Sequence, residues 1–358
     1  MDNLSNSIFI SALVAILAAG VIRIFLGKKE KKRYHPVGAT VFHLMLNFSK
    51  LYDYLTDLTR KNTTFRILYL DNVEIYTSDP ANVEYFLKTN FANYGKDPKY
   101  LKDIILSFII AGKDTTGSAL SWFLYLMCKN PHIQEKIAKE VWEASKFKED
   151  SSIDQIATSI TEEALDNMQL LHAALSETLR LYPSVPAVNQ DGKMCFSDDT
   201  FPDGFSVKKG NLVAYVPYSM GRMKSLWGED AEEFRPERWL DQNGIFQHQS
   251  SFKFTAFQVQ SDHKSLLLDY LKRATQVRLR SARCDKCDVL GLGLGRAGPR
   301  ICLGKEFAYR QMKVFAAVLL SAFSFRLDDE SKPVNYRTML TLQIDGGLHL
   351  RTSSRIKN

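Results

Sequence analysis

The sequence contains few cysteines, and their number and spacing argue against a secreted disulfide framework. Only five occur in 358 residues, an odd number without a dense spacing pattern, whereas small secreted domains carry many paired cysteines. We therefore expect a reducing compartment. Because 45% of the residues are hydrophobic, the chain can bury a sizeable core, as one large domain or two ordinary ones.

The chain also lacks a basic domain, although its formal net charge is +7. Residues 28–33 contribute five positive charges and one negative charge, and residues 259–296 contribute eight and four, so each segment accounts for +4. The rest of the chain therefore carries −1. Nucleic-acid-binding domains concentrate basic residues on one face or stripe, so we expect no nucleic-acid partner.

Long apolar runs are absent except for residues 8–26, in which only a serine and an arginine are polar. A helix of this length spans about 28 Å, close to the ~30 Å of a hydrocarbon core. The basic cluster that follows should stay on the cytosolic side. A cleaved signal peptide is the alternative, but it needs a positive n-region, and the only charge before the run is Asp2. We expect residues 1–33 to be a membrane anchor, with 34–38 as a stiff linker.

Hydrophobic periodicity predicts a mainly helical chain with small β-sheets. Residues 147–162 are polar and are expected to form a loop. We expect helices over 40–60, 80–87, 100–128, 133–146 and 170–181, a hairpin over 66–76, short strands within 185–217, and a C-terminal hairpin with strands 338–344 and 348–351.

The strongest helical stretch has an unusual centre, the segment Ala111-Gly-Lys-Asp-Thr-Thr-Gly117. Glycine and threonine are poor interior helix formers, and threonine hydroxyls can bend a helix by bonding to i−4 carbonyls. Small residues let a ligand approach the backbone, and Asp114 and Thr115 place an acid beside a hydroxyl for proton delivery. A kinked helix with a buried threonine is the alternative.

Glu177 and Arg180 lie three residues apart on one side of a largely apolar predicted helix. Most such pairs are exposed and contribute only about 0.3–0.5 kcal/mol. A buried pair would need a further partner for the second fork of the guanidinium.

Cys302 lies between two glycines, beside an arginine and ahead of a helical run over 305–313. Helix N-termini and nearby cations lower the pKa of a thiol and favour the thiolate. A thiolate there could ligate a metal, and haem iron is one candidate. A buried structural cysteine at a turn is the alternative.

Four motifs in one order resemble the cytochrome P450 family. The segment 111–116 resembles its oxygen-activating helix, and Glu177-Thr-Leu-Arg180 resembles its E-x-x-R motif. Pro236-Glu-Arg-Trp239 is similar to its P-E-R-F/W motif, and Gly298 to Gly304 is similar to its haem-thiolate loop. The amino-acid sequence around these motifs resembles that of plant fatty-acid ω-hydroxylases.

The resemblance implies the cytochrome P450 fold and a heme b cofactor (iron protoporphyrin IX) with Cys302 as its axial ligand. Arg300 would pair with a haem propionate, and Asp114 and Thr115 would protonate bound dioxygen. The remaining residues that it assigns are Phe257, Gly298 and Gly304 in the cofactor-binding loop, and Glu177, Arg180 and Arg238 in a structural ion network.

The implied activity is a haem-dependent monooxygenase that inserts one oxygen atom from O₂ into a C–H bond, with ω-hydroxylation of a fatty acyl chain as the expected reaction. The implied partners are an NADPH-dependent reductase, O₂, a lipophilic substrate contacting residues 185–188 and the C-terminal hairpin, and the endoplasmic reticulum membrane, with a cytosolic catalytic domain. A haem-thiolate isomerase or dehydratase is an alternative, against which the intact Asp114-Thr115 pair argues.

The chain departs from the family pattern within the ligand loop. The family writes this loop F-x-x-G-x-R-x-C-x-G, but here the phenylalanine is Phe257, and deleting residues 259–296 restores the full signature. We interpret these residues as an insertion, with a retained intron as our hypothesis, and expect it to separate Phe257 from the thiolate. Its C-x-x-C at 284–287 has no second pair, and its G-x-G-x-x-G at 293–298 lacks the flanking strand and helix, so we assign neither zinc nor a dinucleotide.

The second departure is a gap before the oxygen-activating helix. The family has a long helical region there, including a W-x-x-x-R helix that contacts the haem, whereas Trp122 is the first tryptophan in this chain. Losing helices that roof the pocket would admit water to the haem. The second hypothesis is therefore a catalytically impaired or non-functional family member, in which residues 34–358 form a truncated haem-thiolate monooxygenase domain.

Overall fold

The computed structural model describes residues 33–69, 72–95, 104–146, 153–187, 193–257, 302 and 304–356. The elements below all belong to one body, His35–Asn358. Within the described residues this body is mainly helical with small sheets, as the sequence predicts. The apolar run 8–26, the segment 259–296, and Gly298 and Arg300 lie outside the described residues.

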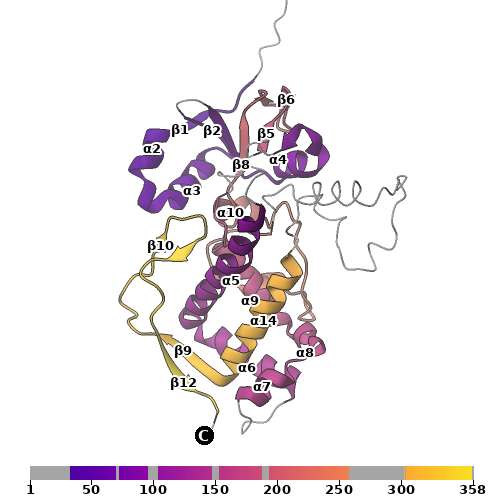
Figure 1. Ribbon diagram of the computed structural model, residues 1–358, viewed down its shortest axis with the longest axis vertical. Coiled ribbons are helices and arrows are strands. Elements are labelled where there is room, and N and C mark those ends of the chain that lie inside the picture. The colour runs from indigo at the N-terminus through magenta and orange to yellow at the C-terminus, as the bar shows by residue number, and fades with distance from the viewer. Residues whose placement is uncertain are drawn as a thin grey trace, which may run out of the picture. The chain divides into compact units, whose positions relative to one another are not determined.

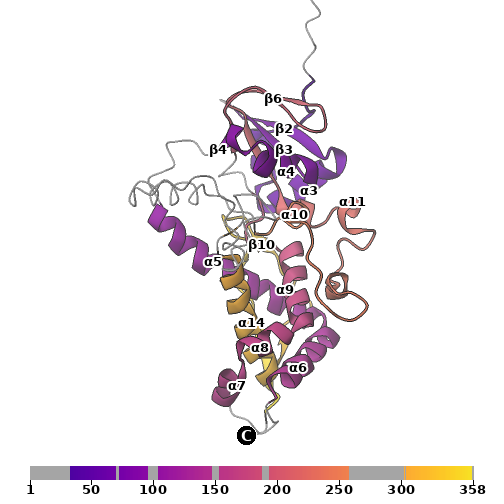
Figure 2. The same cartoon turned by 90° about the vertical axis from the view of Figure 1, so that its right-hand side faces the viewer.

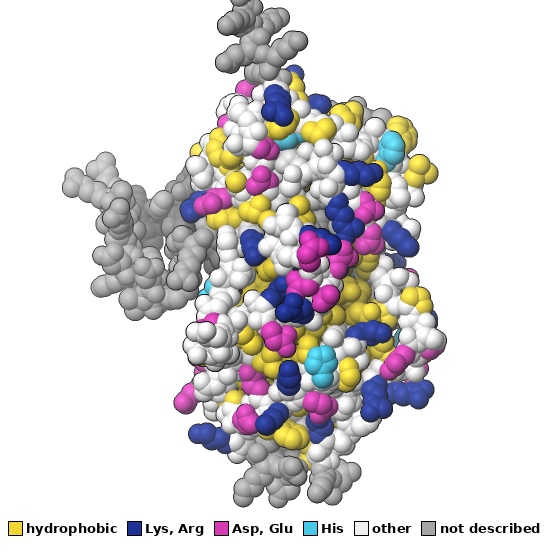
Figure 3. All heavy atoms as spheres, turned by 180° about the vertical axis from the view of Figure 1, so that it is seen from behind, with side chains coloured by type: hydrophobic (Ala, Val, Ile, Leu, Met, Phe, Trp, Pro, Cys, Tyr) yellow, Lys and Arg dark blue, Asp and Glu magenta, His cyan; other side chains and the backbone are white. Residues whose placement is uncertain are grey.

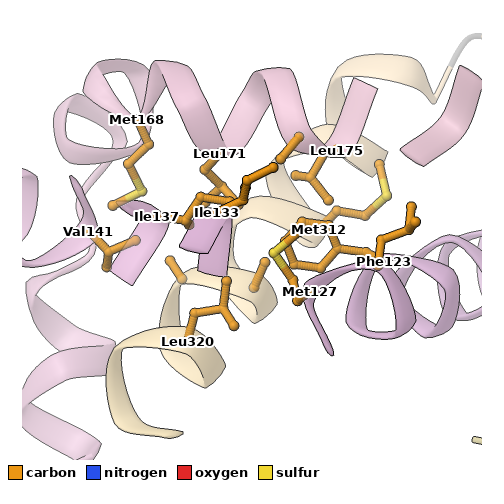
Figure 4. Packing of buried hydrophobic residues seen from close by; sticks show 14 of the residues in the cluster. Phe123, Met127, Ile133, Ile137, Val141, Met168, Leu171, Leu175, Met312 and Leu320 are labelled. Carbon is orange, nitrogen blue, oxygen red and sulfur yellow. The ribbon is translucent and has the colours of Figure 1, made fainter. Parts of the chain in front are cut away.

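Four helices supply most of the largest hydrophobic core (Figure 1). Their apolar residues recur at helical spacing, so each helix turns one face inward. Figure 4 shows Phe123 and Met127 of α5 facing Met312 of α14, with Leu171 and Leu175 of α9 beside them. Each fully buried side chain of this size contributes roughly 1.5–3 kcal/mol. The four are α5 (Ile104–Lys129), α6 (Pro131–Ser145), α9 (Gln169–Leu181) and α14 (Lys305–Ala322).

A six-stranded mixed sheet forms the second part of the body, in the order β1-β2-β3-β8-β5-β4. The predicted hairpin is confirmed, because β2 and β3 pair antiparallel with Phe65 opposite Tyr76. Strand β3 then pairs in parallel with β8, which brings distant parts of the chain together. The strands are β1 (Val37–Thr40), β2 (Thr64–Leu68), β3 (Val73–Thr77), β4 (Tyr94–Gly95), β5 (Lys193–Cys195) and β8 (Leu212–Tyr215).

Shorter elements connect the core and the sheet (Figure 2). The helices are α2 (Val41–Leu46), α3 (Leu51–Lys61), α4 (Pro80–Glu84), α7 (Ile153–Ser159), α8 (Glu162–Asn167), α10 (Pro217–Met220) and α11 (Lys224–Trp227). Single turns of 3-10 helix cover Phe48–Lys50, Phe91–Asn93 and Pro236–Trp239, and a π-turn covers Tyr85–Thr89. Three two-stranded sheets pair β6 (Asp199–Thr200) with β7 (Ser206–Val207), β9 (Phe323–Leu327) with β12 (Leu350–Ser354), and β10 (Tyr336–Arg337) with β11 (Gln343–Ile344).

Two local predictions are wrong. The expected loop 147–162 contains helix α7 and leads into α8, whose first turn is capped by Thr161, the side-chain oxygen of which accepts from the Ala164 N–H at 3.2 Å. The expected linker 34–38 runs into strand β1, and the Pro36 carbonyl accepts from the Arg66 N–H at 2.8 Å. Both elements are too short to show a clear hydrophobic period.

The predicted C-terminal hairpin is also wrong. Strand β11 pairs with β10, which precedes it, while β12 pairs antiparallel with β9, directly after α14. The predicted turn exists, because Gly346 and Gly347 have φ values of 71° and 80° that favour glycine. It joins strands of two different sheets, because strand pairing depends on tertiary contacts that a local pattern does not reveal.

The charge on the surface and the lengths of the helices can be compared with the predicted partners, nucleic acid excluded and a membrane included. On the face seen in Figure 3, acidic and basic side chains are interspersed, and neither sign dominates. No helix in the described part of the chain is long and apolar enough to cross a bilayer. The predicted anchor helix lies outside that part and stays a prediction.

Candidate functional site

The two halves of the predicted ligand loop meet in the structure. The Cys302 N–H donates a hydrogen bond to the Phe257 carbonyl oxygen at 2.7 Å, and the Cys302 carbonyl accepts from the Lys305 N–H at 3.3 Å. Cys302 is a half-buried thiol immediately ahead of α14. The expectation that residues 259–296 separate Phe257 from the cysteine is therefore wrong for the backbone, because this hydrogen bond joins them.

Of the other residues assigned to the loop, the structure describes Gly304 but not Gly298 or Arg300. Gly304 is exposed and occupies the N-cap position of α14, where its carbonyl accepts from the Ala308 N–H at 2.8 Å. Its backbone begins the helix that follows the thiol. Gly298 and Arg300 lie outside the described residues, so their assigned roles stay predictions.

Phe257 packs against Tyr309, which in turn stacks on His172, and the sequence did not predict these ring contacts. The Phe257 ring centroid is 4.9 Å from that of Tyr309, and the His172 ring stacks on Tyr309 at 4.5 Å with an interplanar angle of 18°. The Tyr309 hydroxyl shares a hydrogen bond with the Ser176 hydroxyl at 2.9 Å. Residues of α9 are thereby coupled through α14 to the loop that carries Cys302.

The environment of this stack keeps His172 neutral. Burial, reinforced by electrostatic repulsion from Lys313, His248 and Lys305, lowers the pKa of His172 to about 3. Burial also raises the pKa of the Tyr309 hydroxyl, which therefore stays protonated and able to donate. The stack is uncharged at neutral pH.

The predicted oxygen-activating residues lie on α5, which is continuous through its glycines and threonines. Asp114 is exposed, whereas Thr115 is half-buried and its carbonyl accepts from the Ser184 hydroxyl at 2.7 Å. Apart from the neighbouring turns of α5 itself, no atom of the described residues lies within 4 Å of where a Cβ on Gly112 or Gly117 would stand. In Figures 1 and 2, α5 and α14 begin at the same end of the core that they share.

Part of the predicted substrate-contacting region is tied to α5. The Leu342 carbonyl accepts from the Ser118 hydroxyl and from the Trp122 indole N–H, both at 2.6 Å. Val185 is half-buried, and Val188 lies outside the described residues. These contacts anchor the C-terminal segment beside the centre of α5.

The predicted ion network is assembled and buried. Arg180 donates from Nε and Nη2 to the two carboxylate oxygens of Glu177, both at 2.7 Å, and Arg238 Nε donates to the same carboxylate at 2.8 Å. The side chains of Glu177 and Arg180 are 0% exposed and that of Arg238 is 12% exposed. Arg238 is thus the third member that the resemblance implies, and it binds the carboxylate. The further partners that the buried Arg180 guanidinium requires are backbone carbonyls.

Neighbouring groups complete this network. The Trp239 indole N–H and the Arg235 backbone N–H also donate to Glu177, at 2.8 and 2.9 Å, and Arg180 Nη1 donates to the carbonyls of Gly221 and Ala231. A Cβ at Gly221 would lie 1.9 Å from the Arg180 carbonyl oxygen, so only glycine fits there. The network joins α9 to the 3-10 turn Pro236–Trp239.

Comparisons with known proteins match most of the chain. The family model described as Cytochrome P450 matches residues 33–258 and 296–350, leaving 259–295 unmatched between its two parts. The chain is 41% identical over 308 residues to Cytochrome P450 704C1 of Pinus taeda, covering 82% of this chain and 51% of that protein. It is 35% identical to Cytochrome P450 94A1 of Vicia sativa and 31% identical to Alkane hydroxylase MAH1 of Arabidopsis thaliana, each over 79% of this chain and 46% of the relative. The chain spans about half the length of these curated relatives.

Proposed function

Because the chain belongs to the cytochrome P450 family, we propose that Cys302 is the thiolate ligand of a haem and that the chain derives from a fatty-acyl or alkane hydroxylase. The observation that carries this proposal is the hydrogen bond from Cys302 to Phe257, which holds the thiol in a fixed loop at the start of α14.

The described residues fit a haem group. Cys302 offers a soft sulfur ligand of the kind that haem iron accepts. The open backbone at Gly112 and Gly117 leaves room for a flat group to approach α5. A haem bound there would supply the oxidation of the C–H bond by O₂.

The residues of the chain have separate roles in this proposal. Arg300 would pair with a propionate, and Gly298 would let the loop backbone approach the ring. Asp114 and Thr115 would supply protons. Glu177, Arg180 and Arg238 would hold the scaffold, because their charges are satisfied by one another and by backbone groups.

The name of one relative supports a proposal for the substrate. One relative carries the name of an alkane hydroxylase, and we propose a long lipophilic chain, oxidised at a terminal C–H bond, as the substrate class. The electron donor would be an NADPH-dependent reductase. We propose that residues 8–26 anchor the chain in the endoplasmic reticulum membrane, with the catalytic part in the cytosol.

A second candidate function is a family member with impaired turnover. Asp114 and the adjacent Gly112 and Lys113 are exposed, although proton delivery in such a site requires that bulk water be excluded. This exposure favours a chain that binds haem and turns over slowly.

Reconstitution of the full chain with haem, a reductase and NADPH tests both candidates. Fatty acids and alkanes of several lengths serve as substrates, and Cys302→Ser serves as the matched control. Hydroxylated products that require Cys302 support the hydroxylase. Haem binding that requires Cys302 without product supports the impaired chain, and haem binding equal in Cys302→Ser contradicts both.

A further inference from the structure

Tyr309 makes contacts in two directions, and together they join α9 to the ligand loop. Its hydroxyl shares a hydrogen bond with Ser176 of α9 at 2.9 Å. One neighbour of its ring is His172 of α9 at 4.5 Å, and the other is Phe257 at 4.9 Å. Tyr309 is 4% exposed and Ser176 is 0% exposed, so these contacts are made inside the protein.

The loop that Tyr309 contacts has an unusual connectivity. Phe257 and Cys302 are joined by a hydrogen bond of 2.7 Å, although residues 258–301 stand between them in the sequence. Joining the ends of a chain segment costs entropy that grows with its length. One backbone hydrogen bond contributes little against that cost, so other contacts must hold the two ends.

We propose that Tyr309 is a positioning residue that holds Phe257 and Cys302 together across residues 258–301. Cys302 is held from one side because α14, on which Tyr309 lies, begins three residues after it. Phe257 is held from the other side by the Tyr309 ring. Ser176 and His172 fix the orientation of that ring from α9.

The proposal concerns the loop and is independent of haem binding. An aromatic pair of this geometry, such as Phe257 with Tyr309, should raise the equilibrium constant for joining Phe257 to Cys302 by about 2- to 12-fold. Shortening the connection by removing residues 259–296 should favour the closed loop by on the order of 20-fold, because closure cost scales with the logarithm of length. The two effects are of similar size, so the deletion should offset the loss of the tyrosine.

Hydrogen exchange of the Cys302 amide, resolved by fragmentation and mass spectrometry, measures this closure directly. We expect Tyr309→Leu in the full chain to accelerate exchange of that amide by roughly tenfold. Tyr309→Phe keeps the ring and loses only the hydrogen bond to Ser176, so its effect should be about two- to fivefold. Removing residues 259–296 from the Tyr309→Leu chain should return exchange to about the original rate.

A matched control is Leu320→Ala, which removes another buried side chain of α14 away from the loop. It should lower global stability without selectively accelerating the Cys302 amide. The proposal is wrong if Tyr309→Leu and Leu320→Ala change Cys302 exchange equally. It is also wrong if the deletion fails to compensate. Tyr309→Phe and Ser176→Ala remain informative if Tyr309→Leu does not fold, because each removes only a hydrogen bond and must still accelerate Cys302 exchange selectively.

Discussion

The backbone N–H of Cys302 lies 2.7 Å from the carbonyl oxygen of Phe257, and residues 258–301 separate the two in the sequence. The loop that would carry the haem ligand is therefore closed in spite of its interruption. The unmatched stretch 259–295 in the family comparison coincides with the predicted insertion to within one residue. The centre of α5, which the resemblance assigns to proton delivery, is by contrast exposed at Asp114.

The buried ion network predicts a large loss of stability when one partner is removed. Glu177→Gln leaves Arg180 buried at 0% side-chain exposure with its counter-charge gone, and we expect a loss of about 3–5 kcal/mol in the free energy of unfolding. Urea denaturation followed by circular dichroism measures it. Lys139→Ala breaks a pair with Glu143 that is 77% and 68% exposed, and it should cost less than about 1 kcal/mol. Equal losses in the two variants would contradict the structural role of the network.

The lowered pKa of His172 predicts a pH-dependent stability. Its folded pKa is about 3 and an unfolded histidine titrates near 6.5, so the unfolded state binds the extra proton between these values. Stability contributed by neutral His172 is thus present above about pH 6.5 and lost as the pH falls, by roughly 2 kcal/mol at pH 5.

His172→Phe tests this pH dependence, because it preserves a ring beside Tyr309 and removes the titration. The free energy of unfolding of this variant should fall less steeply from pH 7 to pH 5 than that of the original chain. Leu175→Ala, which removes a buried side chain of α9 that does not titrate, should lower the stability without changing this slope. Parallel pH profiles for the original chain and His172→Phe would show that the histidine is protonated in the folded state.

The exposure of Asp114 predicts a small effect of its removal on turnover. A positioned acid in a closed site contributes typically 10²- to 10⁴-fold. Asp114 is open to solvent, so water can replace it as a proton source. We expect Asp114→Asn to lower any hydroxylation rate by less than about tenfold, measured as product formed per haem. A loss of a hundredfold or more would mean that the centre of α5 is shielded during turnover.

Features carried by local patterns could be predicted from the sequence. Helices α5 and α9 show long apolar faces, and the pairing of Glu177 with Arg180 follows from their spacing on α9. Arg238 lies far away in the sequence, and only the resemblance to a family indicated that it completes the network.

Features that depend on tertiary contacts could not be predicted in this way. Strand β12 pairs with β9 and not with its sequence neighbour β11, because register is decided by the packing of the C-terminal segment. Tyr309 was missed because its partners Ser176 and Phe257 come from distant segments. A signal did exist for α8, since Thr161 followed by two glutamates is a typical helix start.

The absorption spectrum of the reduced, CO-bound full chain tests the central claim most directly, with Cys302→Ser measured beside it. Ligation by Cys302 predicts that the purified chain takes up haem and shows a Soret band of the thiolate type, which Cys302→Ser lacks. A chain that takes up no haem, or a band that is the same in Cys302→Ser, would contradict the assignment of Cys302 as the ligand.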